Sequence, residues 1–439
     1  MTAPKPNIVY IITDQQSADA MSCTGNPYLH TPAVDRLAAA GLRFDAAYAA
    51  YPLCVPARTA MFSGRMPHEL GIYSNVSESR EACPFPMLGR QLADAGYRTH
   101  YIGKWHVAVP EDAHGQHGFE AVACGGGYGG LDSDKAAAAV QYIQNAPPEP
   151  FFLTVSFNNP HDACELARGQ AMRMGPLPAT PSEEALPPVP ENMSESEDAP
   201  SILRAFQREN PGIGCALNWD ATKIRQFRWG YNRLVEMVDY EIGRVLDALE
   251  SQGLWDNTLI VFTSDHGDGQ GAHHWNQKWC HYDESSRVPF IVVDPRRKRA
   301  SAIENQPVSA TLDLFPTLCD YAGIAPPEDV RGRSVRPLLE GHPLDRQFVA
   351  SETTFSTWGK LHQDEWPKAR MIRSARYKYI AYDSGDPREQ LFDMQDDPGE
   401  TRNLAMNADQ SEVLAEHRQY LRAWITWTED TFNLDQATG

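Results

Sequence analysis

The sequence predicts an α/β fold, in which a large, mostly parallel central sheet is flanked by helices, together with a small C-terminal α+β domain that carries an antiparallel sheet. Two observations lead to this prediction. Apolar runs typical of strands buried on both faces alternate with amphipathic helical segments over most of the chain. From about residue 345 the pattern changes to alternating apolar and polar residues followed by one helix. We therefore expect a large domain over residues 1–345 and a small one over residues 346–439.

Four apolar runs define the expected strands of the central sheet, and they cover residues 7–13, 97–103, 151–157 and 257–264. Each run is short and rich in β-branched and aromatic residues, which favours a strand over a helix. Because the runs are nearly continuous, without a regular alternation of apolar and polar residues, both faces of the sheet should be covered by helices.

The helices expected between these strands carry recognisable start and stop signals. In the first, residues 31–41, Thr31 is a candidate N-cap, Pro32 occupies the first helical position and Gly41 ends the helix. Further helices are expected over residues 87–96, 231–253 and 411–430. Within the small domain, residues 368–383 alternate as antiparallel strands do.

Two segments lack a regular pattern. Residues from about 165 to 226 form an expected surface excursion, whose centre, residues 175–201, is rich in proline, serine and glutamate. An excursion is favoured over a linker between domains because the strand pattern resumes after it. The glycine-rich stretch 124–130 should be a flexible loop and not a phosphate cradle, because neither a P-loop lysine nor a GxGxxG pattern accompanies it.

The formal net charge of −19 over 439 residues restricts the partners of the protein. Such an acidic surface repels nucleic acid, polyanions and anionic membranes, so an anionic substrate would require positive charge concentrated in the site. No run of about 18 apolar residues occurs, and the N-terminal apolar run is too short for a signal peptide. We expect no membrane span and a cytoplasmic location, although a leader already removed would leave the same sequence. Whether the chain forms a homo-oligomer is left open.

The eight cysteines are scattered without the spacing of a disulfide framework, and no Cys-x-x-Cys motif occurs. This distribution is typical of reduced thiols in a cytosolic protein, and any one of them could be a small buried apolar residue. Cys54 differs from the others in its surroundings, PLCVPARTAMFSGR, where a proline follows two residues later and an arginine four residues later. Cys54 is therefore either a packed apolar residue or a site of chemistry.

A polar cluster follows each of the four expected strands. The clusters are Asp14 with Gln15, Lys104 with His106, His161, and Asp265 with His266. In an open parallel sheet the carboxyl ends of the strands share one edge, where ligands bind, so we expect one common site. The first and last clusters supply carboxylates, an amide oxygen and an imidazole, which suit a divalent cation. Either dipeptide alone would instead indicate a helix N-cap.

Motifs spread along the chain resemble those of one family. The segment LCVPAR resembles the sulfatase signature Cys/Ser-x-Pro-x-Arg and is followed by a helix and SGR. The motifs GKWH, NPH before Asp162, SDHG, RVPFIV and REQLFDMQDDPGETRNLA (388–405) then match the family in the family's order. On these motifs, which extend over nearly the whole chain, the sequence is identified as a member of the type I, formylglycine-dependent sulfatases. The resemblance implies the alkaline-phosphatase-like form of the fold predicted above, since this family belongs to the alkaline phosphatase superfamily.

The resemblance implies that Cys54 is oxidised to formylglycine by a formylglycine-generating enzyme, which reads the proline and arginine of the motif. The hydrated aldehyde offers two hydroxyls. One attacks sulfur and expels the alcohol, and the other then eliminates sulfate and regenerates the aldehyde, whereas a plain serine or thiol would stay sulfated. The implied activity is that of a sulfuric ester hydrolase, which cleaves a sulfate monoester to an alcohol and inorganic sulfate.

The resemblance also implies roles for individual side chains. Arg58, Lys104 and His106 should hold the diol. His161 and Lys278 should face the sulfate, where either could stabilise the leaving oxygen. His161 is the expected proton donor because its unperturbed pKa lies near neutrality.

The implied metal ligands are Asp14, Gln15, Cys54, Asp265 and His266, which would hold one divalent ion, Ca²⁺ by family. Many sulfatases carry Asp-Asp and Asp-Asn where this sequence has Asp-Gln and Asp-His. The difference removes one formal negative charge and adds one nitrogen ligand, which shifts the preference toward Mn²⁺ or Mg²⁺.

Three other functions fit part of the pattern. The Asp-Gln and Asp-His pairs also resemble the phosphonate monoester hydrolase and choline-sulfatase branch, so a phosphodiesterase or phosphonate monoester hydrolase with the same formylglycine is the main alternative. A non-catalytic binder is opposed by the chemically competent residue at every core position, and it would require an unmodified Cys54. A thiolate nucleophile, Cys54 paired with His106, fits poorly beside metal ligands and lysines.

Charge and aromatic residues indicate the class of substrate. The acidic surface favours a small sulfated metabolite or a short sulfated saccharide over a long polysaccharide. Asn75 is expected to hydrogen-bond the sulfate, and His273 and His274 to bind substrate, although both histidines could equally be structural. Further candidates for selectivity are Trp275, Trp279, the segment 172–208 and, in the C-terminal domain, Trp358, His362 and Trp366, whereas Trp229 is expected to pack on its helix.

Overall fold

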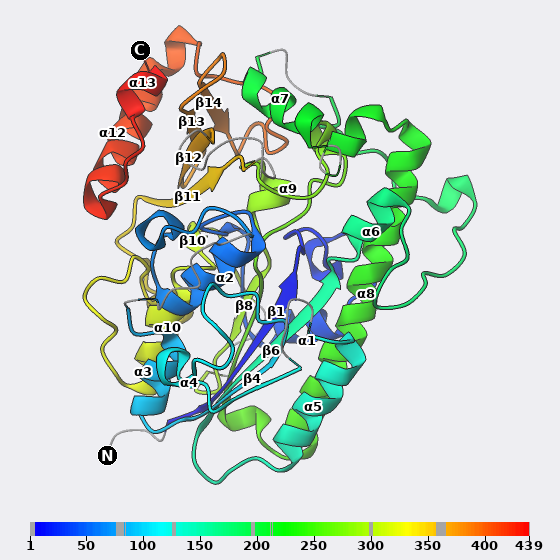
Figure 1. Ribbon diagram of the computed structural model, residues 1–439, viewed down its shortest axis with the longest axis vertical. Helices are drawn as coiled ribbons and strands as arrows, with labels where there is room; N and C mark the ends of the chain where they lie inside the picture. Colours follow the sequence, from blue (N-terminus) through cyan, green and yellow to red (C-terminus); the bar gives the residue numbers. More distant parts are fainter. Residues whose placement is uncertain are drawn as a thin grey trace.

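The computed structural model describes residues 5–75, 83, 85–124, 129–194, 198–210, 212, 214–297, 302–356 and 366–438. Its centre is an eight-stranded sheet with the order β5-β4-β6-β1-β7-β8-β2-β9 (Figure 1). These strands are β1 (Asn7–Asp14), β2 (Leu42–Phe44), β4 (Arg98–Gly103), β5 (Ala121–Ala123), β6 (Phe151–Pro160), β7 (Thr258–Ser264), β8 (Phe290–Val293) and β9 (Ala302–Glu304). Strand β1 pairs in parallel with β6 and β7, whereas β8 runs antiparallel to β7 and β2. The predicted mixed, mostly parallel sheet is therefore confirmed.

Helices cover both faces of this sheet, as the apolar strands require (Figure 1). One layer contains α1 (Pro32–Ala40), α5 (Asp132–Gln144) and α8 (Ala221–Ser251), and the other contains α2 (Cys54–Ser63), α3 (Leu88–Asp94) and α10 (Leu314–Ala322). Along β1, Val9 and Ile11 enter the first core, while Ile8, Tyr10 and Ile12 enter the second. Successive side chains of one strand thus fill opposite cores, which is why the run is apolar throughout.

A second, four-stranded antiparallel sheet follows in the C-terminal part. Its order is β11 (Phe348–Thr354), β12 (Lys368–Ser374), β13 (Tyr377–Tyr382) and β14 (Glu389–Asp393). Helix α12 (Ser411–Thr428) packs on one face through Leu421 and Trp424. The other face packs through Met371 and Ile380 against aromatic side chains of the larger part, including Trp275. The predicted sheet-and-helix unit is present, while its boundary at residue 345 stays a prediction.

The remaining elements are short. They are β3 (Ala47–Tyr48), which pairs with β10 (Val308–Ser309), and the helices α4 (His114–His117), α6 (Ala163–Arg168), α7 (Ser201–Glu209), α9 (Asp283–Ser286), α11 (Arg336–Leu339) and α13 (Leu434–Thr438). None of the helices in the described ranges is long and apolar enough to cross a membrane.

The structure differs from the prediction mainly at the start of the longest helix. Helix α8 begins at Ala221, ten residues before the predicted start, because the Asp220 side chain accepts a hydrogen bond from the Lys223 backbone N–H at 2.7 Å. The excursion before it contains α6 and α7 and is therefore partly helical. Residues 125–128 of the glycine-rich stretch lie outside the described residues.

Candidate active site

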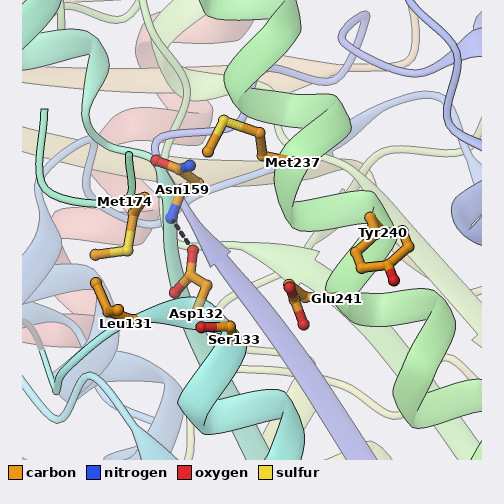
Figure 2. A pocket seen from close by; sticks show the side chains of 8 residues that line it. All are labelled: Leu131, Asp132, Ser133, Asn159, Met174, Met237, Tyr240 and Glu241. Atoms are coloured by element: carbon orange, nitrogen blue, oxygen red, sulfur yellow. Dashed lines mark hydrogen bonds between the residues drawn. The ribbon is translucent and has the colours of Figure 1, made fainter. Parts of the chain in front are cut away.

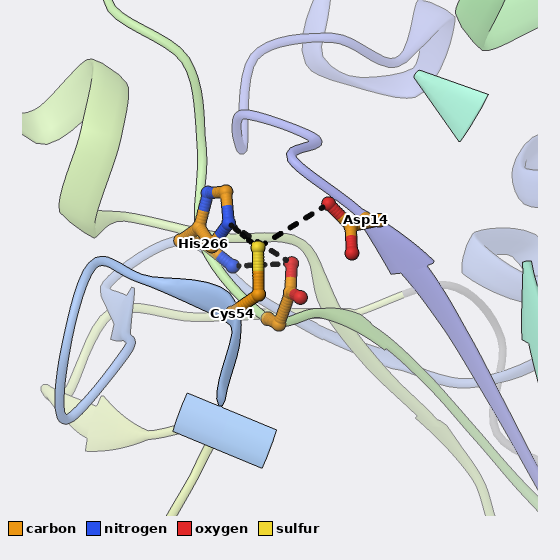
Figure 3. A group of neighbouring side chains, drawn as sticks. Asp14, Cys54 and His266 are labelled. Carbon is orange, nitrogen blue, oxygen red and sulfur yellow. Dashed lines mark hydrogen bonds and ion pairs between the residues drawn. The ribbon is translucent and has the colours of Figure 1, made fainter. Parts of the chain in front are cut away.

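The carboxyl ends of the central strands gather the predicted residues at one edge of the sheet. Asp14 ends β1, Lys104 follows β4, His161 follows β6, and Asp265 follows β7. Helix α2 begins at Cys54, whose side chain lies beside Asp14 (Figure 3). All five side chains are buried. The common site expected from the strand order is thus present in the structure.

The Cys54 side chain lies at the centre of this group. Its Sγ is 3.2 Å from His266 Nε2 and 3.8 Å from Asp14 Oδ1, contacts that Figure 3 draws. It is also 3.2 Å from Lys278 Nζ. Burial and the Asp14 carboxylate oppose ionisation of the thiol. Lys278, together with Lys104 and His266, outweighs them and holds the pKa of Cys54 well below its usual value. The position therefore favours an anionic nucleophile.

Two buried carboxylates are linked by the Arg58 guanidinium. Its Nε donates to Asp265 Oδ2 at 2.7 Å, its Nη2 to Asp14 Oδ2 at 3.0 Å, and its Nη1 to Ser156 Oγ at 2.8 Å. Lys104 Nζ also contacts Asp14 Oδ2, at 2.6 Å. Burial alone would raise the pKa of Asp14, but the positive charges of Lys104 and Arg58 help to lower it well below its usual value. Asp14 is thus held as a carboxylate, the form in which it can bind a cation.

A set of possible metal ligands is formed by Asp14, Cys54, Asp265 and His266, whose donor atoms all lie within 4.8 Å of one another. His266 Nδ1 lies 2.9 Å from the Gly267 carbonyl oxygen, so in the neutral ring Nδ1 donates there and Nε2 is left as the acceptor. Two carboxylates and one imidazole suit a divalent cation such as Mn²⁺, Mg²⁺ or Ca²⁺. The donor set therefore fits a metal, and the ion's identity stays a prediction.

The predicted ligand Gln15 lies beside this set. Its side-chain Oε1 accepts from Lys278 Nζ at 3.0 Å, and its Nε2 donates to Asp268 Oδ2 at 2.6 Å. Gln15 has a positive φ of 72°, and its carbonyl oxygen accepts from the Tyr231 hydroxyl at 2.7 Å. This backbone region is strained for a residue other than glycine, and such a conformation persists only where its surroundings hold it. The hydrogen bonds around Gln15 therefore fix its backbone and the direction in which its side chain leaves the chain.

The two groups predicted to face the sulfate, His161 and Lys278, differ in charge, and His106, predicted to hold the diol, lies beside them. Burial, Lys104 and Lys278 lower the pKa of His161 well below its usual value, so its ring is neutral in this state. Although burial opposes the charge on Lys278, Cys54 and other anions raise its pKa, so it stays an ammonium. His106 hydrogen-bonds Cys54, and burial and Lys104 lower its pKa. The fixed positive charge beside the nucleophile thus comes from the lysines.

Asn75 has a contact that the sequence did not indicate. Its Oδ1 accepts from the backbone N–H of Val55 at 3.0 Å, in the first turn of the helix that begins at Cys54. The side chain therefore satisfies one of the free N–H groups at that helix end. Its expected hydrogen bond to sulfate stays a prediction.

His273 and His274 make different kinds of contact. The ring of His273 stacks on Tyr282 with centroids 3.7 Å apart, and burial followed by Lys378 lowers its pKa to about 3. The carbonyl oxygen of His274 accepts from Gln207 Nε2 at 3.1 Å. The stacked ring of His273 matches the structural alternative, whereas the His274 contact involves only its backbone; a role of either histidine in substrate binding stays a prediction.

The tryptophans proposed for selectivity are also packing residues. Trp275 and Trp279 are buried and lie against Phe206 of α7, with ring centroids 6.2 and 6.0 Å from it. Trp229 is buried on α8, as expected. Trp358 and His362 lie outside the described residues, and Trp366 lies just after that gap.

Behind the end of β6 the structure forms a pocket of about 280 Å³ (Figure 2). Its lining residues are Leu131, Asp132, Ser133, Asn159, Met174, Met237, Tyr240 and Glu241. The Asp132 carboxylate accepts from the backbone N–H groups of Asn158 at 2.7 Å and Asn159 at 2.9 Å, and it pairs with Lys135 at 3.0 Å. Asp132 therefore fixes the backbone that leads to His161, a role that no sequence signal indicated.

Known sulfatases are similar to this chain over most of its length. A family model described as sulfatase matches residues 6–324, and one described as the C-terminal part of N-sulphoglucosamine sulphohydrolase matches residues 271–426. The chain is 32% identical to a Delta 4,5-hexuronate-2-O-sulfatase of Bacteroides thetaiotaomicron, with 98% of this chain and 90% of the relative covered. It is 30% identical to an N-acetylglucosamine-6-O-sulfatase of the same organism, with 95% and 86% covered.

Two solved structures resemble this chain over nearly its whole length. A 2-O GAG sulfatase has a TM-score of 0.84 and 31% identity, with 97% of this chain and 93% of that chain covered. The phosphonate monoester hydrolase of Agrobacterium radiobacter has a TM-score of 0.77 and 23% identity, with 97% and 96% covered, and shows the fold alone.

Proposed function

Because the chain belongs to the sulfatase family, within the alkaline phosphatase superfamily, and is a sulfatase enzyme, we propose that it removes sulfate from a short sulfated saccharide through a formylglycine made from Cys54. The observation that carries this proposal is the setting of Cys54. The residue begins a helix, is fully buried, and lies 3.2 Å from both a lysine and a histidine within a set of metal ligands. A cysteine that served only packing would not require these neighbours.

Two groups must be added to the chain for this chemistry. A formylglycine at position 54 supplies, as its hydrate, one hydroxyl that attacks sulfur and a second that allows sulfate to leave. A bound divalent cation supplies a positive centre that stabilises developing negative charge and polarises a sulfuryl oxygen. Asp14, Gln15, Asp265 and His266 would hold that cation. The Cys54 Sγ stands where the reacting hydroxyl would stand.

The surrounding side chains would bind and orient the sulfate. Lys278 Nζ, 3.2 Å from the Cys54 Sγ, would meet the sulfate with a full positive charge. Lys104 would lie on the same side, since its Nζ contacts Asp14 at 2.6 Å. Arg58, occupied with both carboxylates, would hold the ligand oxygens in place and reach the diol only through them.

His161 would become the proton donor only after the substrate binds. Burial first, and then Lys104 and Lys278, lower its pKa in this state, and a sulfate anion among these cations would cancel part of the effect of the lysines. The pKa of His161 should then rise toward neutrality, where a general acid is effective.

The proposed class of substrate is inferred from the names of the most similar relatives reported above. Two sulfatases that act, by their names, on a 2-O-sulfated hexuronate and a 6-O-sulfated N-acetylglucosamine match over at least 95% of this chain. The formal net charge of −19 disfavours a long polyanion, which would have to approach an acidic surface. A short sulfated saccharide satisfies both observations.

The first experiment is the mass of the tryptic peptide 44–58, which contains Cys54. Conversion to formylglycine lowers that mass by about 18 Da. An unmodified peptide, from a host known to convert such motifs, would refute the proposed nucleophile. Cys54→Ala should abolish hydrolysis with folding intact, as judged by circular dichroism.

The main alternative is a phosphonate monoester hydrolase, because a sulfate monoester and a phosphonate monoester carry the same single charge at neutral pH. Matched aryl sulfate and aryl phosphonate monoesters, compared by kcat/KM on one preparation, separate the two. A higher kcat/KM for the phosphonate would overturn the assignment of sulfate as the preferred group.

A further inference from the structure

Gln15 makes hydrogen bonds at both ends of its side-chain amide. Nε2 donates to Asp268 Oδ2 at 2.6 Å, while Oε1 accepts from Lys278 Nζ at 3.0 Å and from Cys164 Sγ at 3.4 Å. All four side chains are at most 3% exposed, so water does not compete for these bonds. The amide is thus held between an anionic and a cationic group.

Both partners select the same orientation of the amide. An ionised carboxylate only accepts hydrogen bonds, and an ammonium only donates them. Turning the Gln15 amide over would place its NH₂ against Lys278 and its oxygen against Asp268, with two repulsive contacts. The oxygen is therefore directed to the side on which Lys278 and Cys54 lie, 3.2 Å from each other.

Asp268 is itself held in place. Its Oδ1 accepts from the backbone N–H of Gln270 at 2.8 Å, and its own backbone N–H donates to Ser17 Oγ at 3.0 Å. The backbone of Gln15 is fixed independently, since its N–H donates to Asp265 Oδ1 at 3.1 Å and its carbonyl accepts from Tyr231. With the backbone held, the orientation of the amide is set by its side-chain partners, of which Asp268 is the one that accepts from Nε2.

We propose that Asp268 is a positioning residue that, through the Gln15 amide, turns Oε1 toward the site of the divalent cation, on the side where Lys278 and Cys54 lie. This inference rests on the proposed function in one respect, because the cation is the one expected in the sulfatase site. A carboxylate ligand that turns over presents an equivalent oxygen, whereas an amide ligand that turns over presents its NH₂ group. Asp268 thus acts behind the ligand, as partners of metal ligands commonly do.

A double-mutant cycle on Mn²⁺ affinity tests the proposal. Mn²⁺ is titrated calorimetrically into EDTA-treated protein, and all variants are prepared with the same extent of conversion of Cys54 to formylglycine. Asp268→Asn has one oxygen for two donors, Gln15 Nε2 and the Gln270 N–H. It should weaken Mn²⁺ binding about 10- to 100-fold, the usual effect of losing a partner of a metal ligand. In a Gln15→Met background, which has no amide, the same substitution should change Kd by no more than about twofold.

Two outcomes would overturn the proposal. Wild-type affinity in Asp268→Asn would show that the amide needs no partner. An equal loss in the Gln15→Met background would show that the Asp268 charge acts directly on the cation. Asp239→Asn is the matched control, since Asp239 is also buried and its two oxygens also each accept a hydrogen bond, in this case from the backbone N–H groups of Ala33 and Val34. It should leave Mn²⁺ affinity unchanged.

Gln15→Glu supplies a second test if Asp268→Asn does not fold. The new carboxylate would face Asp268 at hydrogen-bonding distance, and the two would share a proton. Binding of Mn²⁺ should then release about one more proton than in the wild type, measured calorimetrically in buffers of different ionisation enthalpy. Equal proton release would refute the contact. None of these readouts depends on sulfate turnover, so a failure of the proposed function and a failure of this inference are separable.

Discussion

Raising the pH should loosen the attachment of the C-terminal sheet, because a buried histidine there has to be protonated. His68 Nδ1 lies 2.6 Å from Glu352 Oε2, and Nε2 lies 3.1 Å from the Thr428 carbonyl oxygen. Neither oxygen can donate, so both ring nitrogens must carry hydrogen. Although burial opposes the charge, Glu352 raises the pKa of His68 to about 9.

The magnitude follows from linkage between protonation and folding. The ordinary histidine pKa is about 6.5, and a rise to about 9 corresponds to about 3 kcal/mol of stability. Because the folded-state pKa is the higher one, this stability is fully present below about pH 6.5. It is lost as the pH rises through about 9. The side chain of His68 is only 7% exposed, so solvent screens little of the effect.

The assay compares urea unfolding of the wild type and His68→Gln at pH 6 and at pH 9.5. Glutamine retains a donor but cannot gain charge, so the wild type should exceed the variant at pH 6 and lose that advantage, about 3 kcal/mol, by pH 9.5. A difference that does not change between the two pH values would refute the reasoning. So would an NMR titration that gives His68 an ordinary pKa.

Three further predictions concern the site. Asp265→Ala should abolish activity and lower the metal content measured by mass spectrometry, and full occupancy would remove Asp265 from the ligands. His161→Ala should slow esters of poor leaving groups more than those of good ones; an equal loss in kcat/KM for both would indicate that His161 only positions sulfate. Asp132→Asn should lower kcat about 10- to 100-fold by releasing the backbone before His161, with the melting temperature separating this effect from unfolding. An unchanged kcat would contradict that role.

The strands and the edge where the site lies could be predicted because burial on both faces leaves a direct mark on the sequence. All eight residues of β1 are buried, and the observed span, Asn7–Asp14, extends the predicted 7–13 by one residue. The polar residue that ends such a run has to lie at the rim of the sheet. Residues from four strands could therefore be assigned to one site without any contact being known.

The partners of those residues could not be predicted, because hydrogen bonds between distant segments leave no periodic pattern. Arg58 was expected beside the diol, yet its donors are used by Asp265, 207 positions away, by Asp14 and by Ser156. Asp268 follows the motif SDHG closely enough to be noticed, but its contact with Gln15 spans 253 positions. Asp132 belongs to none of the sequence motifs described above.

The distribution of charge explains how a chain of net charge −19 can bind an anion. Around Cys54 the buried cations Arg58, Lys104 and Lys278 face the carboxylates Asp14 and Asp265, so the described site is already less acidic than the surface. Three cations against two carboxylates already leave these side chains positive, and a divalent cation would add to that charge. Replacing a carboxylate ligand by Gln15 moves the balance further in that direction, which favours capture of one sulfate group. On the proposed function, the acidic exterior should disfavour substrates that carry many such groups, because each additional charge would lie outside the positive centre.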